Sequence, residues 1–235
     1  MVSFVIGLEF FGIGLILVAL LLLINGDGAR EQKLLIFIMA GSLVQNVGYL
    51  LELIAPTVEA AMTAVTVENV GSAFVPLCYC WFTYTYCYVR PPKKLLHGLG
   101  LINFFVLPTV LFNWNGLFYR EVQWLSTAEG FHYVSISYGP LYILFMITRI
   151  VIPYMLSIHT LARSVRLRSD QQISRQYWTI LGISSLPVVV LAAYVFKLIQ
   201  VFDLTPVTLA IAMSMVVIVV WSRRNYDFRH LAAEK

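Results

Sequence analysis

The chain has 235 residues, of which 60% are hydrophobic and 12% are charged, and its mean hydropathy is +0.81. A soluble domain typically carries about 25% charged residues, so this composition excludes an ordinary soluble protein and predicts an all-α membrane protein. The formal net charge of +4 does not indicate nucleic-acid binding, because the basic residues alternate with the apolar runs and form no single patch.

Seven apolar segments are long enough to cross a bilayer, which takes about 20 residues in a helix. They predict a seven-transmembrane-helix bundle over residues 1–222, with residues 223–235 as a cytoplasmic connector to an output domain that this chain lacks. The first segment is too long for a signal peptide and has no basic residues before it, so we expect it to remain as a spanning helix. The segments are Val2–Ile24, Leu34–Ala55, Thr57–Val89, Leu95–Phe112, Gly139–Leu161, Tyr177–Val201 and Leu204–Trp221.

The third segment combines a buried acid with a helix breaker. Glu68 lies roughly 15 Å along this helix, where an ionisable group costs about 2.5–3.5 kcal/mol or more unless it has a partner or faces water. Pro76 should bend the helix, because proline removes a backbone donor and clashes with the preceding turn. The three cysteines of the chain also fall here. No histidine lies near them in the sequence, so we interpret them as packing residues and expect neither a disulfide nor a metal site.

Lysine and arginine placement predicts the orientation of the bundle. The first, third and fifth connectors and the tail together hold 13 basic residues, whereas the opposite connectors hold only Arg120. This asymmetry places the N-terminus outside and the C-terminus in the cytoplasm. The long connector Asn113–Tyr138 then lies outside. Its aromatic and β-branched runs predict a hairpin-like loop, which is either a lid over a pocket or an interfacial loop with tryptophans at headgroup level.

With that orientation, most buried polar groups fall in the outer half of the bundle or near its middle. Gln45, Tyr49 and Glu52 share one face of the second helix, because their spacing is four and three. Glu68 and Arg149 are candidate partners for each other or contacts for a ligand. A structural ion pair, interhelical hydrogen bonds and side chains that reach water are the open alternatives. The candidate ligand-binding residues are Glu68, Arg149, Gln45, Asn46, Tyr49, Glu52, Tyr142 and Lys197.

Several functions of multi-helix membrane proteins are excluded. The seventh segment has no lysine to bind retinal, and no internal repeat indicates a two-fold transporter architecture. The four histidines are far apart and form no His-Glu-x-x-His motif, and neither a Gly-x-Ser-x-Gly nor a phosphate-binding loop is present. We therefore expect no enzymatic activity in this chain, no cofactor and no metal.

Four stretches of the sequence are informative together: Glu68-Asn69-Val70-Gly71 before Pro76, Gly139-Pro140-Leu141-Tyr142, Phe202-Asp203-Leu204-Thr205-Pro206-Val207 and Arg223-Arg224-Asn225-Tyr226-Asp227-Phe228. With them, the sequence resembles the N-terminal seven-helix sensor region of bacterial histidine kinases, which is also found fused to diguanylate cyclase-type outputs. The similar stretches cover most of the chain in order. In that family the seventh helix feeds PAS, histidine-kinase or GGDEF-type domains, and the resemblance carries over Glu68 alone as a candidate binding position.

Together, the residues and the resemblance predict a sensory receptor domain. It would bind a small extracellular or membrane-borne ligand in an outer-half pocket and pass the signal through the seventh helix to a cytoplasmic output. The alternatives are a transporter of a small solute or ion, whose path needs polar residues in both halves, and a ligand-free scaffold. The expected partners are the ligand, the lipid bilayer and a second copy bound through the output domain, with no nucleic acid. The expected location is a bacterial inner or plasma membrane.

Overall fold

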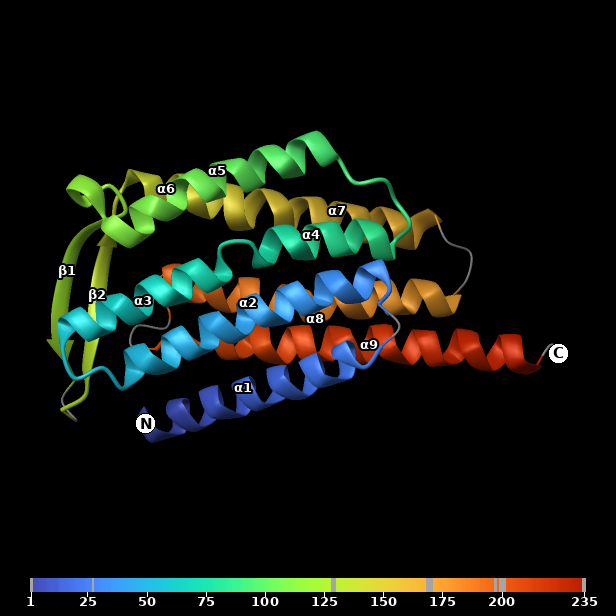
Figure 1. Cartoon of the computed structure of the whole chain (residues 1–235), viewed down its shortest axis with the longest axis horizontal. Coiled ribbons are helices and arrows are strands. Elements are labelled where there is room, and N and C mark those ends of the chain that lie inside the picture. Colours follow the sequence, from blue (N-terminus) through green and yellow to red (C-terminus); the bar gives the residue numbers. More distant parts are fainter. Residues whose placement is uncertain are drawn as a thin grey trace.

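The computed structural model describes residues 2–26, 28–127, 130–167, 171–196, 198 and 202–233, the last eleven of these by their backbone alone. Seven of its helical stretches are long and apolar enough to cross a membrane, and they run along the long axis of the molecule (Figure 1). This agrees with the predicted seven-helix bundle. The elements are α1 (Val2–Ile24), α2 (Arg30–Leu53), α3 (Val58–Ser72), α4 (Val75–Tyr86), α5 (Lys93–Phe112), η1 (Trp114–Gly116), β1 (Tyr119–Ser126), β2 (His132–Tyr138), α6 (Pro140–Met146), η2 (Ile147–Val151), α7 (Ile152–Leu167), α8 (Gln171–Val195) and α9 (Thr205–Ala233).

The third spanning stretch is broken, not merely bent. α3 ends at Ser72 and α4 begins at Val75, with Pro76 in the first turn of α4. Proline fits there because the first N–H groups of a helix have no intrahelical partner, whereas its ring prevents α3 from continuing. The break leaves the Ala73 carbonyl without its helical partner. The side-chain amide of Asn103 on α5 donates to it over 3.4 Å, so a neighbouring helix satisfies the interrupted backbone.

The fifth spanning stretch contains a π-helical turn. Its residues Ile147–Val151 form η2 between α6 and α7. Pro153 is the second residue after this turn. It has no N–H to donate to the Arg149 carbonyl four residues earlier, so the regular series of helical hydrogen bonds is interrupted here. The Thr148 hydroxyl donates to Asn103 Oδ1 over 2.8 Å. Asn103 thereby ties this irregular turn to the break between α3 and α4.

α2 and α3 touch through glycines. A Cβ on Gly48 would lie 2.6 Å from the Glu68 amide nitrogen, and one on Gly71 would lie 2.7 Å from the Gln45 amide nitrogen. Small residues at such contacts let helix backbones approach each other closely inside a membrane. As a result, the face of α2 that carries Gln45 lies directly against the turn of α3 that carries Glu68.

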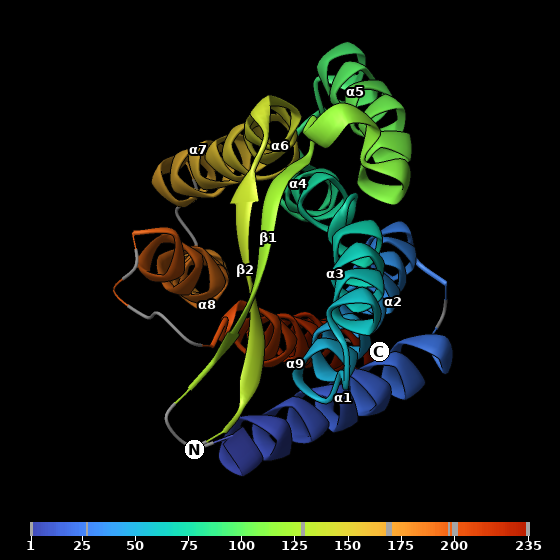
Figure 2. The same cartoon turned by 90° about the vertical axis from the view of Figure 1, so that its left-hand side faces the viewer.

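The segment between α5 and α6 forms an antiparallel two-stranded hairpin, in which Trp124 pairs with Val134. Asn113 anchors its base, because its side chain accepts from the Tyr119 amide and donates to the Tyr119 carbonyl, each over 2.8 Å. At the other strand, Gly139 packs against the Leu117 carbonyl so closely that no Cβ would fit. Figure 2 shows the hairpin crossing one end of the helix bundle.

The two ends of the bundle differ in character. The N-terminus of α1 lies at the hairpin end, whereas the starts of α2, α5 and α8 and the end of α9 lie at the other (Figure 1). Basic residues such as Arg30, Lys93 and Arg175 are at this second end. The largest apolar core fills the interior toward that end and includes Tyr79, Phe82 and other buried side chains of α1, α2, α4, α7, α8 and α9. The interior near the hairpin is more open, and it contains the polar groups described next.

Candidate functional site

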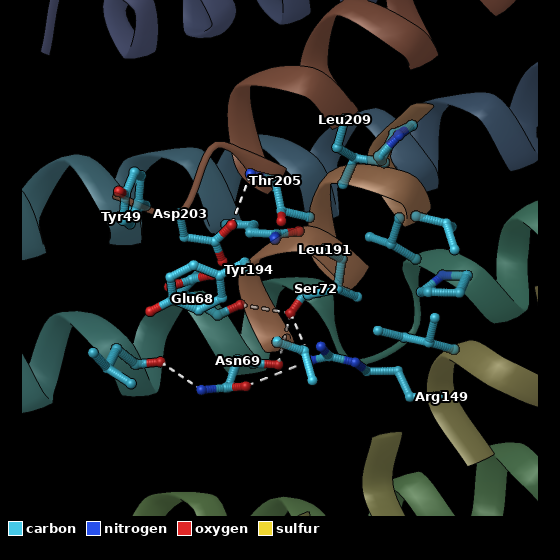
Figure 3. Close-up of a pocket in the computed structure, with 18 of the residues that line it drawn as sticks. Tyr49, Glu68, Asn69, Ser72, Arg149, Leu191, Tyr194, Asp203, Thr205 and Leu209 are labelled. Carbon is cyan, nitrogen blue, oxygen red and sulfur yellow. Dashed lines mark hydrogen bonds between the residues drawn. The ribbon is translucent and has the colours of Figure 1, made fainter. Parts of the chain in front are cut away.

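A cavity of about 660 Å³ lies inside the bundle beneath strand β2. Side chains from α2, α3, η2 and α8 and from the start of α9 form its walls (Figure 3). Pockets that bind small molecules typically enclose about 300–1,000 Å³ and combine an apolar lining with a few placed polar groups. The size and the mixed lining of this cavity match that description.

One wall of the cavity is the polar face of α2. Gln45, Tyr49 and Glu52 all line it, as their helical spacing predicts. The close glycine contact between α2 and α3 brings this face against Glu68. Gln45 is only 5% exposed, and its Oε1 has no hydrogen-bond partner. A buried acceptor without a donor is costly, so Gln45 Oε1 is an unsatisfied position in this wall.

The facing wall carries Arg149 on the π-helical turn. Its Nη1 donates to the Ser72 hydroxyl over 2.9 Å and to Asn69 Oδ1 over 3.5 Å, and its guanidinium lies 4.7 Å from the centre of the Phe145 ring. The residue is 8% exposed. The hydrogen bonds and the aromatic face hold the cation against α3. Figure 3 shows Arg149 beside Asn69 and Ser72.

A direct ion pair between Glu68 and Arg149, one of the alternatives from the sequence, is not formed among the described residues. Both residues line the cavity, but no salt bridge joins them in the described part of the chain, where Arg149 instead bonds to the neutral Ser72 and Asn69. The reason is helical geometry, since Asn69 and Ser72 are one and four residues beyond Glu68 and meet the guanidinium first. Glu68 therefore keeps a carboxylate that faces the cavity.

A second carboxylate enters the cavity from the segment before α9. Asp203 Oδ1 accepts a hydrogen bond of 2.8 Å from the Thr205 amide, which closes an Asx-type turn at the start of that helix. Burial raises the pKa of the Asp203 carboxyl above its usual value, whereas the hydrogen bond from Thr205 and the positive charge of Arg149 oppose that shift. Figure 3 shows Asp203 in the same region as Glu68 and Tyr194.

Tyrosines form much of the remaining lining. Tyr138 of β2 stacks on Tyr142 of α6 with ring centres 3.6 Å apart, so the hairpin and α6 meet over the cavity. Burial is the main reason that the pKa of the Tyr138 hydroxyl lies well above its usual value, so this hydroxyl stays protonated and can donate. Tyr119 of β1 accepts a hydrogen bond of 3.2 Å from Asn69, which links the hairpin to the residues that hold Arg149.

Comparison with known proteins identifies the family. A family model described as the N-terminal 7TM region of histidine kinase matches residues 8–229, which is nearly the whole chain. The chain belongs to this family. The search of the curated proteins returned no match. The histidine-kinase seven-helix region is a sensor region and is not itself catalytic, so the chain is a multi-pass membrane protein of the sensor type.

The structure brings together six of the eight candidate residues of this histidine-kinase sensor region. Asn46 does not line the cavity. Its Nδ2 donates to the Ser42 carbonyl over 2.8 Å, and its Oδ1 is close to Gly12 of α1, so it packs between helices. Lys197 lies outside the described residues. The six residues that line the cavity are Gln45, Tyr49, Glu52, Glu68, Tyr142 and Arg149.

Other lining residues of the sensor region were not among the candidates. Asn69 and Ser72 were missed although Ser72 shares a helix face with Glu68, a signal that the sequence offers. Tyr194 and Asp203 fall at the right depth in the sequence, but only the fold shows that they face Glu68. For the hairpin, a lid over a pocket was one of the two alternatives from the sequence, but the sequence does not indicate which hairpin residues line the cavity, because strand β2 reaches it through tertiary packing. The further polar lining residues are Tyr79, Tyr133, Ser135, Tyr138, Tyr154, Ser184 and Thr205.

The lining of the cavity combines charged, aromatic and apolar side chains. Three carboxylates, one guanidinium and seven tyrosines line the cavity among the residues described. In the same part of the chain, no group of three or more histidine, cysteine, aspartate or glutamate side chains is placed to hold a metal ion. The groups are spread around the walls, an arrangement suited to orienting a small molecule by several contacts.

Proposed function

We propose that this chain is the sensory domain of a transmembrane receptor, and that it binds a small molecule in the cavity beneath the hairpin. The observation that carries the proposal is the cavity itself, whose charged and tyrosine-rich lining lies inside a membrane-spanning bundle of a sensor family. Groups such as Glu68 and Arg149 are costly at this depth unless water or a ligand meets them, which supports a functional role.

The basic residues support an orientation with the hairpin outside and the C-terminus in the cytoplasm. Residues such as Arg30, Lys93 and Arg175 lie at the end opposite the hairpin, as the positive-inside rule requires of a cytoplasmic face. In this orientation the cavity faces the exterior of a bacterial inner or plasma membrane, and residues 223–235 lead to a cytoplasmic output. We further propose that the receptor acts as a homodimer joined through that output domain.

A route from the cavity to the output helix begins at the hairpin tip. The Phe131 ring lies 5.5 Å from the Phe202 ring, and the next residue is Asp203, which lines the cavity and bonds to Thr205 at the start of α9. A ligand that contacts both β2 and Asp203 would favour one position of this segment. Such a ligand shifts the output only through different affinities for the two arrangements.

A cavity-filling substitution tests the proposal without knowledge of the ligand. The chain is fused through α9 to the catalytic region of a histidine kinase, and autophosphorylation is measured in membranes. Val188→Phe, which places a ring in the cavity, should change the output, whereas Val189→Phe should not, because Val189 is 63% exposed on the outer side of α8. Equal output from both variants and the unsubstituted fusion would overturn the proposal.

Transport is the competing function, and the floor of the cavity disfavours it. A path must reach both faces of the membrane, but below the cavity Tyr79 and Met213 belong to the largest apolar core. Flux measurements on proteoliposomes that contain the chain separate the two functions. Uptake above that of empty vesicles for a solute that binds in the cavity would favour a transporter over a receptor.

A further inference from the structure

We infer that the ligand of this cavity is an organic cation, an ammonium group on an apolar body, and this inference rests on the proposed function. The carboxylates of Glu52, Glu68 and Asp203 would hold the ammonium near the hairpin, with tyrosine rings around it. The apolar body would extend toward the middle of the bundle.

The charge of the lining favours a cation. Glu52, Glu68 and Asp203 are the acidic residues of the described lining, and Arg149 is its only described cation. With all four ionised, the lining carries two more negative charges than positive ones. Like charges inside a low-dielectric interior repel one another, and a bound cation relieves that cost.

An unsatisfied acceptor points to the same ligand chemistry. Gln45 lines the cavity and is only 5% exposed, and its Oε1 has no donor among the residues that the structure describes. It lies on the same helix face as Tyr49 and Glu52. An ammonium group brings three N–H donors and accepts none, so it matches a wall made of carboxylates and a free amide oxygen.

Arg149 does not make the cavity a site for anions. Its Nη1 is already bonded to Ser72 and Asn69, its Nη2 lies 3.7 Å from Met146 Sδ, and Phe145 covers one face of the guanidinium. Recognition of a carboxylate or phosphate by arginine commonly uses two parallel N–H groups of the fork. Here Nη1 donates to two side chains of the cavity wall, and Nε is buried without a partner among the described residues, so the guanidinium does not present two free parallel N–H groups through Nη1 and Nε.

The tyrosines suit a cation as well. Seven tyrosines line the cavity, and Tyr138, Tyr142 and Tyr194 come from the hairpin, α6 and the end of α8 near the acidic groups. The face of an aromatic ring attracts ammonium groups, by about 0.5–2 kcal/mol depending on how dry the site is. Carboxylates and aromatic ring faces together form a typical binding site for an ammonium group.

The deeper lining determines the rest of the ligand. Moving away from the hairpin, α9 presents Leu209 and then Met213, and α8 presents Val188 and Pro187. These side chains are apolar and favour an apolar body for the part of the ligand beyond its ammonium group, beside the hydroxyls of Tyr154 and Ser184.

Three probes that share a phenylethyl body test the inference: 2-phenylethylamine, 2-phenylethanol and 3-phenylpropionate, which are cationic, neutral and anionic at pH 7. Binding to the chain in lipid nanodiscs is measured by calorimetry, with empty nanodiscs as the blank. We expect the amine to bind at least about tenfold more tightly than the other two, a difference of about 1.4 kcal/mol.

Charge-neutral variants locate the bound amine. Glu68→Gln and Asp203→Asn should each weaken binding of 2-phenylethylamine by about tenfold. Glu59→Gln is the matched control, because Glu59 is an exposed carboxylate at the start of the same helix α3, and it should leave binding unchanged. Both neutral variants keep the shape of the side chain, so a loss of affinity reports the charge.

The possible failures are distinguishable. Three results would each overturn the cation inference. They are binding of the anion as tight as that of the amine, an affinity for the amine that neither Glu68→Gln nor Asp203→Asn changes, and no binding of the amine at all. None of these outcomes touches the proposed receptor function, which the kinase fusion with Val188→Phe tests separately. If that fusion shows no effect, the receptor function fails even where the amine binds.

Discussion

Asn69 connects three parts of the molecule through one side chain. Its Nδ2 donates to the Tyr119 hydroxyl of β1 and to the Val65 carbonyl, and its Oδ1 accepts from Arg149. The hairpin therefore meets the buried cation through a single amide. Any force on β1 at this point reaches the turn that carries Arg149.

Replacing this amide should destabilise the bundle. Asn69→Ala removes the link and leaves part of the Arg149 guanidinium without an acceptor, so we expect a loss of about 1–3 kcal/mol in the free energy of unfolding. Denaturant unfolding in detergent micelles measures it. Thr63→Ala is the control, because the exposed Thr63 hydroxyl bonds only to the Glu59 carbonyl of its own helix. Equal stability losses in both variants would contradict the assigned role.

Asp203 should make stability depend on pH. Its pKa is raised in the folded protein, mainly by burial, so the folded state binds the proton more tightly than the unfolded state. Its contribution to stability is full below the ordinary aspartate pKa of about 3.9 and is lost as the pH rises through the higher folded-state value. Asp203→Asn keeps an oxygen that can accept the hydrogen bond from Thr205. Because asparagine cannot ionise, the variant does not lose this contribution to stability as the pH rises.

The variant should therefore be more stable than the unsubstituted protein at neutral pH. The difference should shrink as the pH falls toward the ordinary aspartate pKa, because both proteins then have a neutral side chain at this position. Thermal unfolding over a pH series measures it without ligand. A constant difference across the series would show that the Asp203 charge is not the cause. Glu52, Glu68 and Arg149 line the same cavity and interact with the Asp203 charge, so part of the pH dependence of the difference arises through these groups.

At the scale of elements, the contact between α2 and α3 depends on the absence of side chains. A Cβ on Gly48 would press on the Glu68 backbone, so Gly48→Leu must push α3 away from α2. We expect loss of several kcal/mol of stability or failure to fold, as for other overpacked interiors. Gly7→Leu is the control, since nothing lies within 4 Å of the position of its Cβ. Folded yield and unfolding midpoint in detergent report the result.

The sequence predicts the spanning helices well for a physical reason. Each must be apolar over about 20 residues to cross lipid, so it can be recognised from the composition of its own segment. The break before Pro76 was also foreseeable as a bend, because proline acts locally. The π-helical turn around Arg149 was not, since its effect depends on how the interrupted backbone is satisfied by neighbouring helices.

The cavity was predictable only in part. Gln45, Tyr49 and Glu52 follow from helical spacing, and the depth of Glu68 and Arg149 was correct enough to place both in one cavity. Their lack of a direct ion pair depends on the rotation of η2 against α3, which sequence does not give. Strand β2 enters the lining by crossing the end of the bundle, a purely tertiary arrangement.

At the scale of the whole molecule, the hairpin and the output helix meet near the cavity. Phe131 contacts Phe202, and both belong to a small apolar cluster with Val5, Tyr49 and Leu53 at the hairpin end. The cluster joins α1, α2, the hairpin and the segment before α9. We expect it to couple movement of the hairpin to the first turn of α9.

Removing one ring of this cluster should loosen the start of α9. For Phe131→Ala we expect faster amide hydrogen exchange in the first turn of α9, because local opening becomes less costly when apolar contacts are lost. Leu125→Ala serves as the control, since Leu125 is on the same hairpin and 37% exposed. Exchange measured by mass spectrometry in nanodiscs should separate the two variants. Identical exchange in α9 would show that the hairpin tip does not restrain it.

The direction of the Arg149 side chain depends on the π-helical winding of the backbone that carries it. Each residue of a regular helix turns the next by about 100°, so deleting one residue within Ile147–Val151 would let the segment rewind as an ordinary α-helix and swing one side of it by about that angle. A single-codon deletion at this turn, with no change of charge, would then carry the guanidinium away from Ser72 or realign the following helix toward the cytoplasm. The direction in which the Arg149 side chain points therefore depends on the number of residues in this turn as well as on the side chain itself.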